Sequence, residues 1–145
     1  MKVIIQRCLN ASCTVDNNIT GKIEKGYMIL FGFTHTDNID KINKMVKKII
    51  NLRIFEDENG KMNLNILQVN GSILSISQFT LYANTNEGNR PSFSNAMAPD
   101  NAKKLYHLFN NALRSEGLQV EEGIFGADMK IDFINDGPVT IVLEF

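Results

Sequence analysis

Short apolar runs and alternating segments near the start of the chain predict β-strands. Residues 3–5 form an apolar run, and over residues 11–15 apolar and polar side chains alternate, which is typical of a half-buried strand. Residues 16–18 (Asp-Asn-Asn) have the composition of a turn. Residues 26–33 are almost entirely apolar, which indicates a strand that is buried on both faces.

Two later stretches repeat apolar residues at the helical period. In the first, Asp37 is the expected N-cap, and the apolar stripe comprises Ile39, Ile42, Val46, Ile49 and Ile50. In the second, Pro99 and Asp100 suit a first helical turn, and Gly117 suits the end of the helix. The stripe of this second helix comprises Ala102, Leu105, Tyr106, Phe109 and Leu113.

The remaining segments predict further strands joined by polar turns. These are, in chain order, a strand at 52–55, a turn at 56–61, a strand at 72–81, a loop at 84–95, and strands near 118–124, 130–134 and 139–143. Asn135-Asp136-Gly137-Pro138 is interpreted as a tight turn between the last two strands.

Two strand–helix–strand units with extra strands predict a mixed α/β fold. No linker, repeat or low-complexity stretch divides the chain, so we expect a single domain over residues 1–145. No glycine-rich phosphate loop follows the first strand, which argues against a Rossmann sheet. A sheet-on-sheet core with the helices on one side fits the elements better.

Composition narrows the functional classes without selecting one. The 15 basic and 16 acidic residues give a net charge of -1, so charge alone does not indicate nucleic-acid binding. No apolar run reaches the ~20 residues of a membrane span, and a cytoplasmic location is expected. Cys8 and Cys13 match neither a Cys-X-X-Cys nor a zinc pattern, and we expect both to be buried and reduced.

Familiar catalytic signatures are missing from the sequence. There is no Gly-X-Ser-X-Gly elbow and no His-Glu-X-X-His motif, and we expect neither a metal nor a cofactor. His107 lies off the apolar stripe of its helix and is interpreted as solvated. His35 follows a buried strand, a position where catalytic residues often occur, but a lone loop histidine is more often without such a role.

Two other stretches contain the candidate chemistry. Ser77-Gln78-Phe79-Thr80-Leu81 ends a predicted strand, where backbone N–H groups without a ladder partner can face a substrate oxygen. The alternative is an ordinary strand with Ser and Thr on its wet face. The segment 135–140 can present backbone carbonyls to a ligand from a rigid turn, or it can be a plain hairpin turn.

Together these stretches resemble the D-aminoacyl-tRNA deacylases, the D-tyrosyl-tRNA(Tyr) deacylase family. The resemblance covers the whole chain, and its motifs are specific as an ordered set. They are Val3–Arg7, Asn51–Asp57, Gly60–Asn63, Ser77–Leu81, Arg90–Ser94, Phe125–Met129 and Asn135–Thr140.

The resemblance implies a fold, an assembly and a site. The fold is the family's three-layer sandwich of two β-sheets, barrel-like, with helices on one side, and the protein is a homodimer. The catalytic residues are Ser77, Gln78, Phe79 and Thr80, and a cis Gly137-Pro138 turn from the other subunit excludes L-amino acids. Arg7, Asn135 and Thr140 support that turn, and Phe125 and Met129 bind the terminal adenosine.

The implied reaction is ester hydrolysis at the 3′ end of an aminoacyl-tRNA. D-aminoacyl-tRNA, and glycyl-tRNA mischarged on tRNA(Ala), would release free tRNA, with the tRNA 2′-hydroxyl assisting the cleavage. Two alternatives stay open: a non-catalytic tRNA-binding dimer, and a small-molecule esterase with Thr80 as its nucleophile.

Two basic features bear on tRNA contact. Family members often carry a lysine and paired arginines before Pro91, whereas residues 86–90 here read Asn-Glu-Gly-Asn-Arg, which lowers the positive charge. The first helix carries a run of lysines that is a candidate secondary tRNA contact or simply a solvated face: Lys41, Lys44, Lys47 and Lys48.

Overall fold

The computed structural model describes all residues from 1 to 145. Its elements, in chain order, are β1 (Lys2–Val15), β2 (Asn18–Gly32), α1 (Ile39–Asn51), β3 (Phe55–Glu56), β4 (Met62–Leu64), β5 (Ser72–Ser77), the 3₁₀ helix η1 (Phe79–Tyr82), α2 (Pro99–Ser115), β6 (Val120–Glu122) and β7 (Lys130–Glu144).

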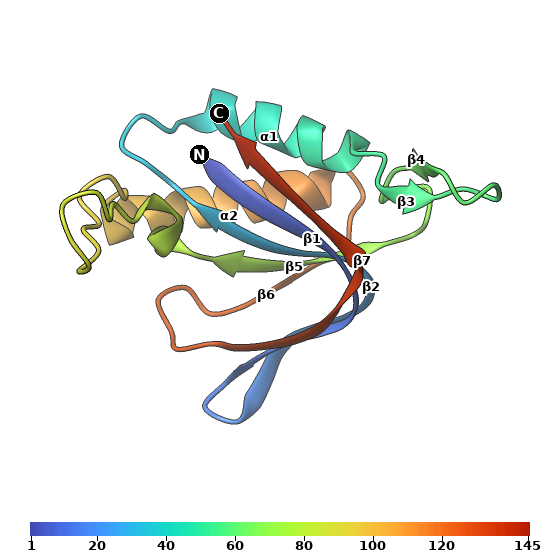
Figure 1. Cartoon of the computed structure of the whole chain (residues 1–145), viewed down its shortest axis with the longest axis horizontal. Helices are drawn as coiled ribbons and strands as arrows, with labels where there is room; N and C mark the ends of the chain where they lie inside the picture. The colour runs from blue at the N-terminus through green and yellow to red at the C-terminus, as the bar shows by residue number, and fades with distance from the viewer.

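Five strands form the main sheet in the order β6-β5-β2-β1-β7, while β3 and β4 form a separate small hairpin (Figure 1). The β1 strand pairs antiparallel with β2 and β7, whereas β5 runs parallel to both β2 and β6. The predicted class is therefore confirmed: the fold is mixed α/β, with two sheets of very unequal size. The main sheet stays open, with β6 and β7 at its edges, and does not close into a barrel.

Both helices cover one face of the main sheet, where the largest hydrophobic core lies (Figure 1). Side chains along β1 alternate between the two faces of the sheet, and Val3 and Ile5 on the face towards the helices are fully buried. Phe31 stacks on Tyr106 of α2, with 5.4 Å between ring centroids. The Tyr106 hydroxyl lies 3.3 Å from the Ser75 carbonyl oxygen and 3.4 Å from that of Gly123, so α2 is fixed to β5 and to the segment after β6.

The first and last strands are longer than the sequence pattern predicts. The runs at 3–5 and 11–15 belong to one strand, β1. The tight turn predicted at 135–138 is wrong, because both flanks of this segment pair with β1 in the same direction. Gln6 is opposite Thr140, and Cys8 is opposite Asn135. The extra residues between these pairs bulge out of β7 without reversing the chain.

Three other boundaries also differ from the prediction. Asn38, not Asp37, caps α1 by accepting a hydrogen bond from the Lys41 N–H at 3.1 Å. The strand predicted at 72–81 ends at Ser77, because the chain then tightens into η1. The strand predicted at 52–55 reduces to Phe55–Glu56. The start of α2 at Pro99 is confirmed, and Gly117, with a φ of +88°, lies just beyond its end as expected.

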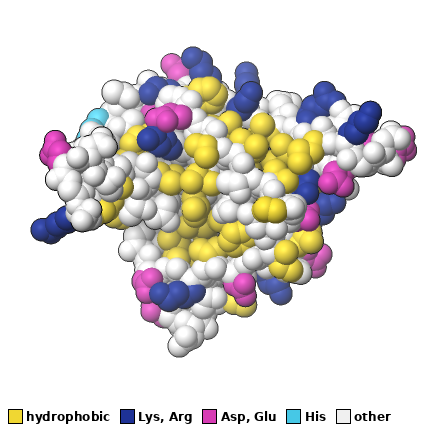
Figure 2. Space-filling view, in the orientation of Figure 1, with side chains coloured by type: hydrophobic (Ala, Val, Ile, Leu, Met, Phe, Trp, Pro, Cys, Tyr) yellow, Lys and Arg dark blue, Asp and Glu magenta, His cyan; other side chains and the backbone are white.

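The sheet face opposite the helices is left partly bare. Cross-strand partners Val142, Ile4, Leu30 and Ile76 form one apolar row across β7, β1, β2 and β5. Val142, at the edge, is 65% exposed. In Figure 2, hydrophobic side chains gather over the middle of this face. Neither helix combines the length and the apolarity that a membrane span needs.

Candidate functional site

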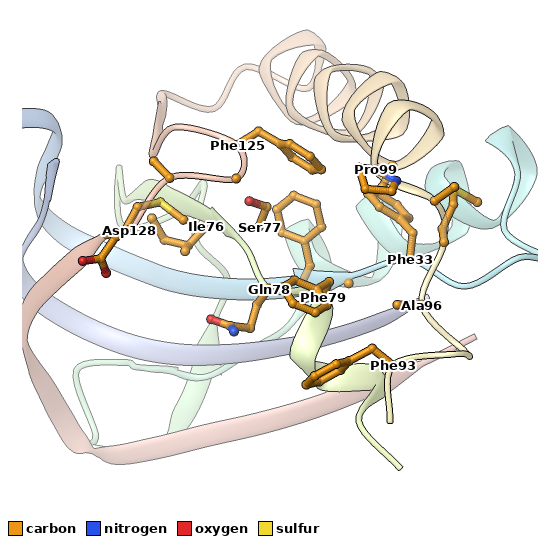
Figure 3. A pocket seen from close by; sticks show the side chains of 18 of the residues that line it. Phe33, Ile76, Ser77, Gln78, Phe79, Phe93, Ala96, Pro99, Phe125 and Asp128 are labelled. Carbon is orange, nitrogen blue, oxygen red and sulfur yellow. The ribbon is translucent and has the colours of Figure 1, made fainter. Parts of the chain in front are cut away.

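A cavity of about 650 Å³ opens where β2 and β5 end, beside the first turn of α2 and the segment between β6 and β7. Its volume lies within the usual range for small-molecule sites, about 300–1,000 Å³. Its lining is mostly apolar, with aromatic side chains on opposite sides (Figure 3). Among the predicted site residues it brings together Ser77, Gln78, Phe79, Phe125 and Met129.

The Ser77–Thr80 segment turns at the rim of this cavity. The Gln78 N–H donates to the Phe31 carbonyl at 2.7 Å, which extends the β2–β5 pairing by one residue. Gly32 makes room for this path, because a Cβ there would lie 2.8 Å from the Gln78 carbonyl oxygen. The first N–H groups of a helix have no acceptor within it. The N–H groups of Phe79 and Thr80, which begin η1, therefore lie free of its internal hydrogen bonds.

Thr80 is exposed and does not line the cavity. Its hydroxyl oxygen accepts a short hydrogen bond from the Gln78 side-chain amide. An amide N–H cannot take up a proton, so this contact does not activate the hydroxyl as a nucleophile. No histidine lines the cavity, and its single carboxylate, Asp128, is exposed and paired with Lys130 at 2.9 Å. The site contains backbone donors and lacks a side-chain base.

Phe125 and Met129 form the inner side of the cavity. Phe125 lies 5.7 Å from the buried Tyr106 ring and packs against the main core, so its position is fixed from behind. The Met129 sulfur lies over Gly123, where a Cβ would collide with it. Both side chains are partly exposed, and their apolar surfaces can contact a flat ligand.

The second predicted cluster surrounds the bulge of β7. The Gly137-Pro138 peptide bond is cis, as the family resemblance implies, and both residues are exposed. Arg7 reaches them from β1 with a side chain that is only 6% exposed. Its Nε donates to the Asp136 carbonyl at 3.1 Å and its Nη1 donates to the Ile54 carbonyl at 2.8 Å. The guanidinium thus links the bulge to the segment before β3.

The polar side chains predicted to support the turn lie at the base of the same bulge. The Asn135 amide oxygen accepts from the Val139 N–H at 3.3 Å, and its amide nitrogen donates to the Thr140 hydroxyl at 3.4 Å. Gln6 also donates to that hydroxyl, at 3.5 Å. These contacts join the two sides of the bulge at its base.

Within one chain the two clusters lie apart. Gly137 and Pro138 do not line the cavity. They belong to β7, whereas Ser77 ends β5, and the sheet order places these strands three steps apart. The bulge lies beside Arg7, which is opposite Tyr27, and Tyr27 is opposite Ile73 at the start of β5, so the bulge is level with the end of β5 that is far from Ser77. The residues expected to form one site therefore form two separate groups in a single subunit.

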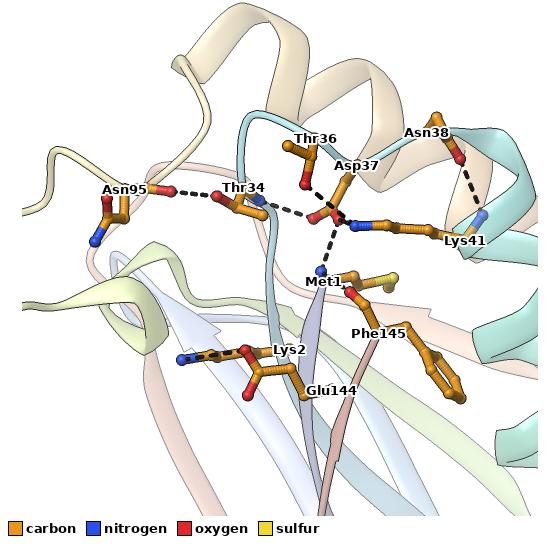
Figure 4. Close-up of polar contacts among 10 residues, drawn as sticks. All are labelled: Met1, Lys2, Thr34, Thr36, Asp37, Asn38, Lys41, Asn95, Glu144 and Phe145. Atoms are coloured by element: carbon orange, nitrogen blue, oxygen red, sulfur yellow. Dashed lines mark hydrogen bonds and ion pairs between the residues drawn. The ribbon is translucent and has the colours of Figure 1, made fainter.

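A polar network holds the loops beside the cavity (Figure 4). The Met1 amino group forms a fully buried ion pair with Asp37 at 2.7 Å. Burial lowers the pKa of this amino group, although the Asp37 carboxylate acts in the opposite direction. The Thr34 N–H donates to the same carboxylate at 2.8 Å, and the Thr34 hydroxyl donates to the Asn95 carbonyl at 2.7 Å.

This network ties the segment after β2 to the segment before α2, and both segments line the cavity. Phe33 and Met97 face the cavity from these segments, joined by a Met97 N–H to Phe33 carbonyl hydrogen bond of 2.9 Å. Sequence reasoning missed these two residues and assigned no role to Phe93, although the quoted motif Arg90–Ser94 contains it. An aromatic residue in an otherwise polar loop was the available signal.

The sequence and the fold are similar to those of known proteins. The family model described as D-Tyr-tRNA(Tyr) deacylase matches residues 4–144. A protein named D-aminoacyl-tRNA deacylase from Limosilactobacillus reuteri is 54% identical over 144 residues, covering 99% of each chain. One of the same name from Thermosipho africanus is 51% identical, covering 99% of this chain and 97% of the relative. The chain belongs to the D-Tyr-tRNA(Tyr) deacylase family.

Two solved structures are also similar. One described as c-Myc DNA Unwinding Element Binding Protein superposes with a TM-score of 0.94 at 40% identity, covering 100% of this chain and 99% of that one. Another, from a study of a probable eukaryotic D-amino acid tRNA deacylase, has a TM-score of 0.83 at 18% identity, covering 98% and 97%. At that identity the second similarity supports the fold alone.

Proposed function

We propose that this protein hydrolyses the ester bond of D-aminoacyl-tRNA, releasing free tRNA and the D-amino acid. Family membership over residues 4–144 supports the reaction class. The observation that carries the proposal is the cavity lined by Ser77, Gln78 and Phe79, which has no side-chain base and lies beside the first N–H groups of η1, for which that helix offers no acceptor. Such a site suits an ester whose oxyanion needs stabilising and whose own chemistry supplies the proton transfer.

We place the terminal adenosine between Phe125 and Met129, with the ester carbonyl at the Phe79 and Thr80 N–H groups. The 2′-hydroxyl of that adenosine assists the cleavage. The protein then contributes positioning and oxyanion stabilisation, and one such donor is typically worth about 10²–10³ in rate. In this mechanism Thr80→Ala keeps the backbone donor and most of the activity, whereas a terminal 2′-deoxy tRNA is cleaved far more slowly.

A two-fold homodimer completes the site. The apolar row supports this assembly, because Val142 is exposed, Ile4 and Leu30 are partly exposed, and an apolar patch on a sheet face can mark a protein–protein interface. In the dimer, the Gly137-Pro138 bulge of each subunit enters the other subunit's cavity, as an isologous interface allows. The separation of the two clusters within one chain supports the same arrangement.

The bulge selects by stereochemistry. Its carbonyls bind the substrate amino group while the Phe79 and Thr80 N–H groups hold the ester, which fixes two directions at the α-carbon. An L side chain then meets the bulge, a D side chain points to open space, and glycine has no side chain to exclude. Glycyl-tRNA mischarged on tRNA(Ala) is therefore also a substrate. A clash with rigid backbone discriminates more than a methylene-sized pocket difference, which supplies about 1–3 kcal/mol.

The test compares purified protein on D-Tyr-tRNA, L-Tyr-tRNA and Gly-tRNA(Ala). We expect rapid release of D-tyrosine and glycine with L-Tyr-tRNA left intact, and sedimentation as a dimer. Equal rates on both tyrosyl esters would refute chiral selection. Tight tRNA binding without turnover would instead favour the non-catalytic tRNA-binding dimer. Burst kinetics on simple esters with an adduct on Thr80 would favour the esterase.

A further inference from the structure

Two exposed aromatic rings lie together at the mouth of the cavity. Phe79 of η1 is 57% exposed, and Phe93 of the following loop is 37% exposed. Their ring centroids are 4.9 Å apart in an edge-on arrangement. In Figure 3, this pair lies on the side of the cavity away from Phe125. The two rings form a contiguous apolar surface, and such surfaces, unlike single exposed apolar residues, can mark an interaction site.

The loop that carries Phe93 is fixed on both sides. Before it, Asn84 and Ser92 exchange two backbone hydrogen bonds of 2.8 and 2.9 Å. After it, the His35 ring nitrogen is 2.8 Å from the Ser94 carbonyl oxygen, and Thr34 holds Asn95 as described above. The ring is thus presented by an ordered backbone, which reduces the entropy lost when a ligand stacks on it.

We propose that the Phe79–Phe93 pair is a second nucleotide subsite, on which the base preceding the terminal adenosine stacks. This inference rests on the proposed function. A cavity of about 650 Å³ has room for an aminoacylated nucleoside but not for a polynucleotide, so the rest of the RNA must leave over the rim.

The chemistry of the rim fits a single-stranded nucleotide. Every base has a π-face, so stacking on an aromatic ring is a sequence-tolerant contact worth about 1–3 kcal/mol per base. Arg90, three residues before Phe93, is exposed and forms no ion pair, which leaves its charge available to a phosphate. Residues 86–90 contain one acidic and one basic side chain, Glu87 and Arg90, so stacking rather than net positive charge is the expected main contact of this loop.

The experiment measures kcat/KM on three D-tyrosyl esters: adenosine, the dinucleotide cytidylyl-adenosine, and the same dinucleotide lacking the cytosine base. With the wild-type chain, we expect removal of the base to lower kcat/KM about tenfold, within the range for base–aromatic stacking. In Phe93→Ala the two dinucleotides should differ less than about twofold, while Phe93→Tyr should keep the wild-type ratio. Leu108→Ala, which removes a side chain 42% exposed on the outer face of α2, is the matched control and should also keep it.

Binding of the uncharged dinucleotides, measured by calorimetry, should show the same ratios in Kd. Equal values for the two dinucleotides in the wild type, or an unchanged base effect in Phe93→Ala, would overturn the subsite. Weaker dimerisation of Phe93→Ala with the base effect intact would assign the ring to the subunit interface instead. If no D-tyrosyl ester is cleaved and no dinucleotide binds, the proposed function fails as well, which is a distinguishable result.

Discussion

The two halves of the main sheet hold their functional groups in different ways. The parallel half, β2-β5-β6, ends in a cavity whose inner wall is backed by α2 through Phe125 and Tyr106. The antiparallel half, β1-β7, carries a bulge that projects from the sheet and is held by side-chain hydrogen bonds, chiefly from Arg7. The inner wall of the cavity is maintained by packing, whereas the bulge is maintained by polar contacts.

This difference indicates which substitutions should change stability and catalysis and which should change the selectivity for D over L substrates. Packing errors spread through a core, so changes in the parallel half should affect stability and catalysis together. Changes to the polar contacts at the bulge should alter the choice between D and L substrates, whether or not they also destabilise the fold. Three substitutions test this contrast, beginning with the largest expected effect.

Arg7→Ala should have the largest effect. Removing the guanidinium leaves the Asp136 and Ile54 carbonyls without their donor, at about 1–3 kcal/mol for each buried group. We expect urea unfolding to show a loss of about 2–4 kcal/mol, and the D-to-L ratio of kcat/KM to fall strongly. Arg53→Ala, which removes a single exposed hydrogen bond to the Asn63 carbonyl, should change neither by much. Intact selectivity in Arg7→Ala would contradict the polar support of the bulge.

Gly137→Ala should act mainly on selectivity. Gly137 has a φ of +125°, and a Cβ there would lie 2.8 Å from a Val139 methyl and 3.2 Å from the Arg7 Nη2. We expect a backbone penalty of about 1–3 kcal/mol in thermal unfolding and measurable cleavage of L-Tyr-tRNA. Gly88→Ala is the control, because its φ is +135° with nothing within 4 Å of the new Cβ. Gly88→Ala should lose stability to a similar extent but should not cleave L-Tyr-tRNA. If both variants cleave L-Tyr-tRNA, backbone strain alone would explain the loss of selectivity.

Tyr106→Phe should have the smallest effect, and it probes the packed half. Losing the hydroxyl shared by the Ser75 and Gly123 carbonyls should cost about 0.5–1.5 kcal/mol. Burial raises the pKa of Tyr106, so the unfolded chain ionises first as the pH passes about 10. The free energy of unfolding therefore falls as the pH rises above about 10, and it should fall less steeply in Tyr106→Phe, which lacks this hydroxyl. Equally steep curves for wild type and variant would refute this role for Tyr106.

Local signals in the sequence predicted the two helices and most of the strands, but not which distant strands pair. Pro99 and Gly117 mark α2 correctly because caps are local features. The Asn135–Pro138 segment has turn composition, yet its flanks keep pairing with β1, which only the tertiary structure reveals. Asp37 and Asn38 can both cap a helix, and the choice depends on the Met1 amino group, 36 residues away.

The candidate site shows the same limit. The groups around Ser77–Thr80 and Gly137-Pro138 were found from motifs, whereas Phe33 and Met97 belong to the cavity only because hydrogen bonds join two distant loops. Periodicity contains no information about such contacts. The side chains at the mouth of a pocket are therefore the last features that a sequence reveals.

Because one chain keeps its cavity and its bulge apart, accuracy in the proposed reaction would belong to the proposed dimer rather than to each subunit. The cleavage rate and the selectivity for D over L substrates would then depend differently on the protein concentration. Isolated subunits would still bind the nucleoside but would no longer discriminate D from L aminoacyl groups. The cellular concentration of this protein would therefore set its selectivity.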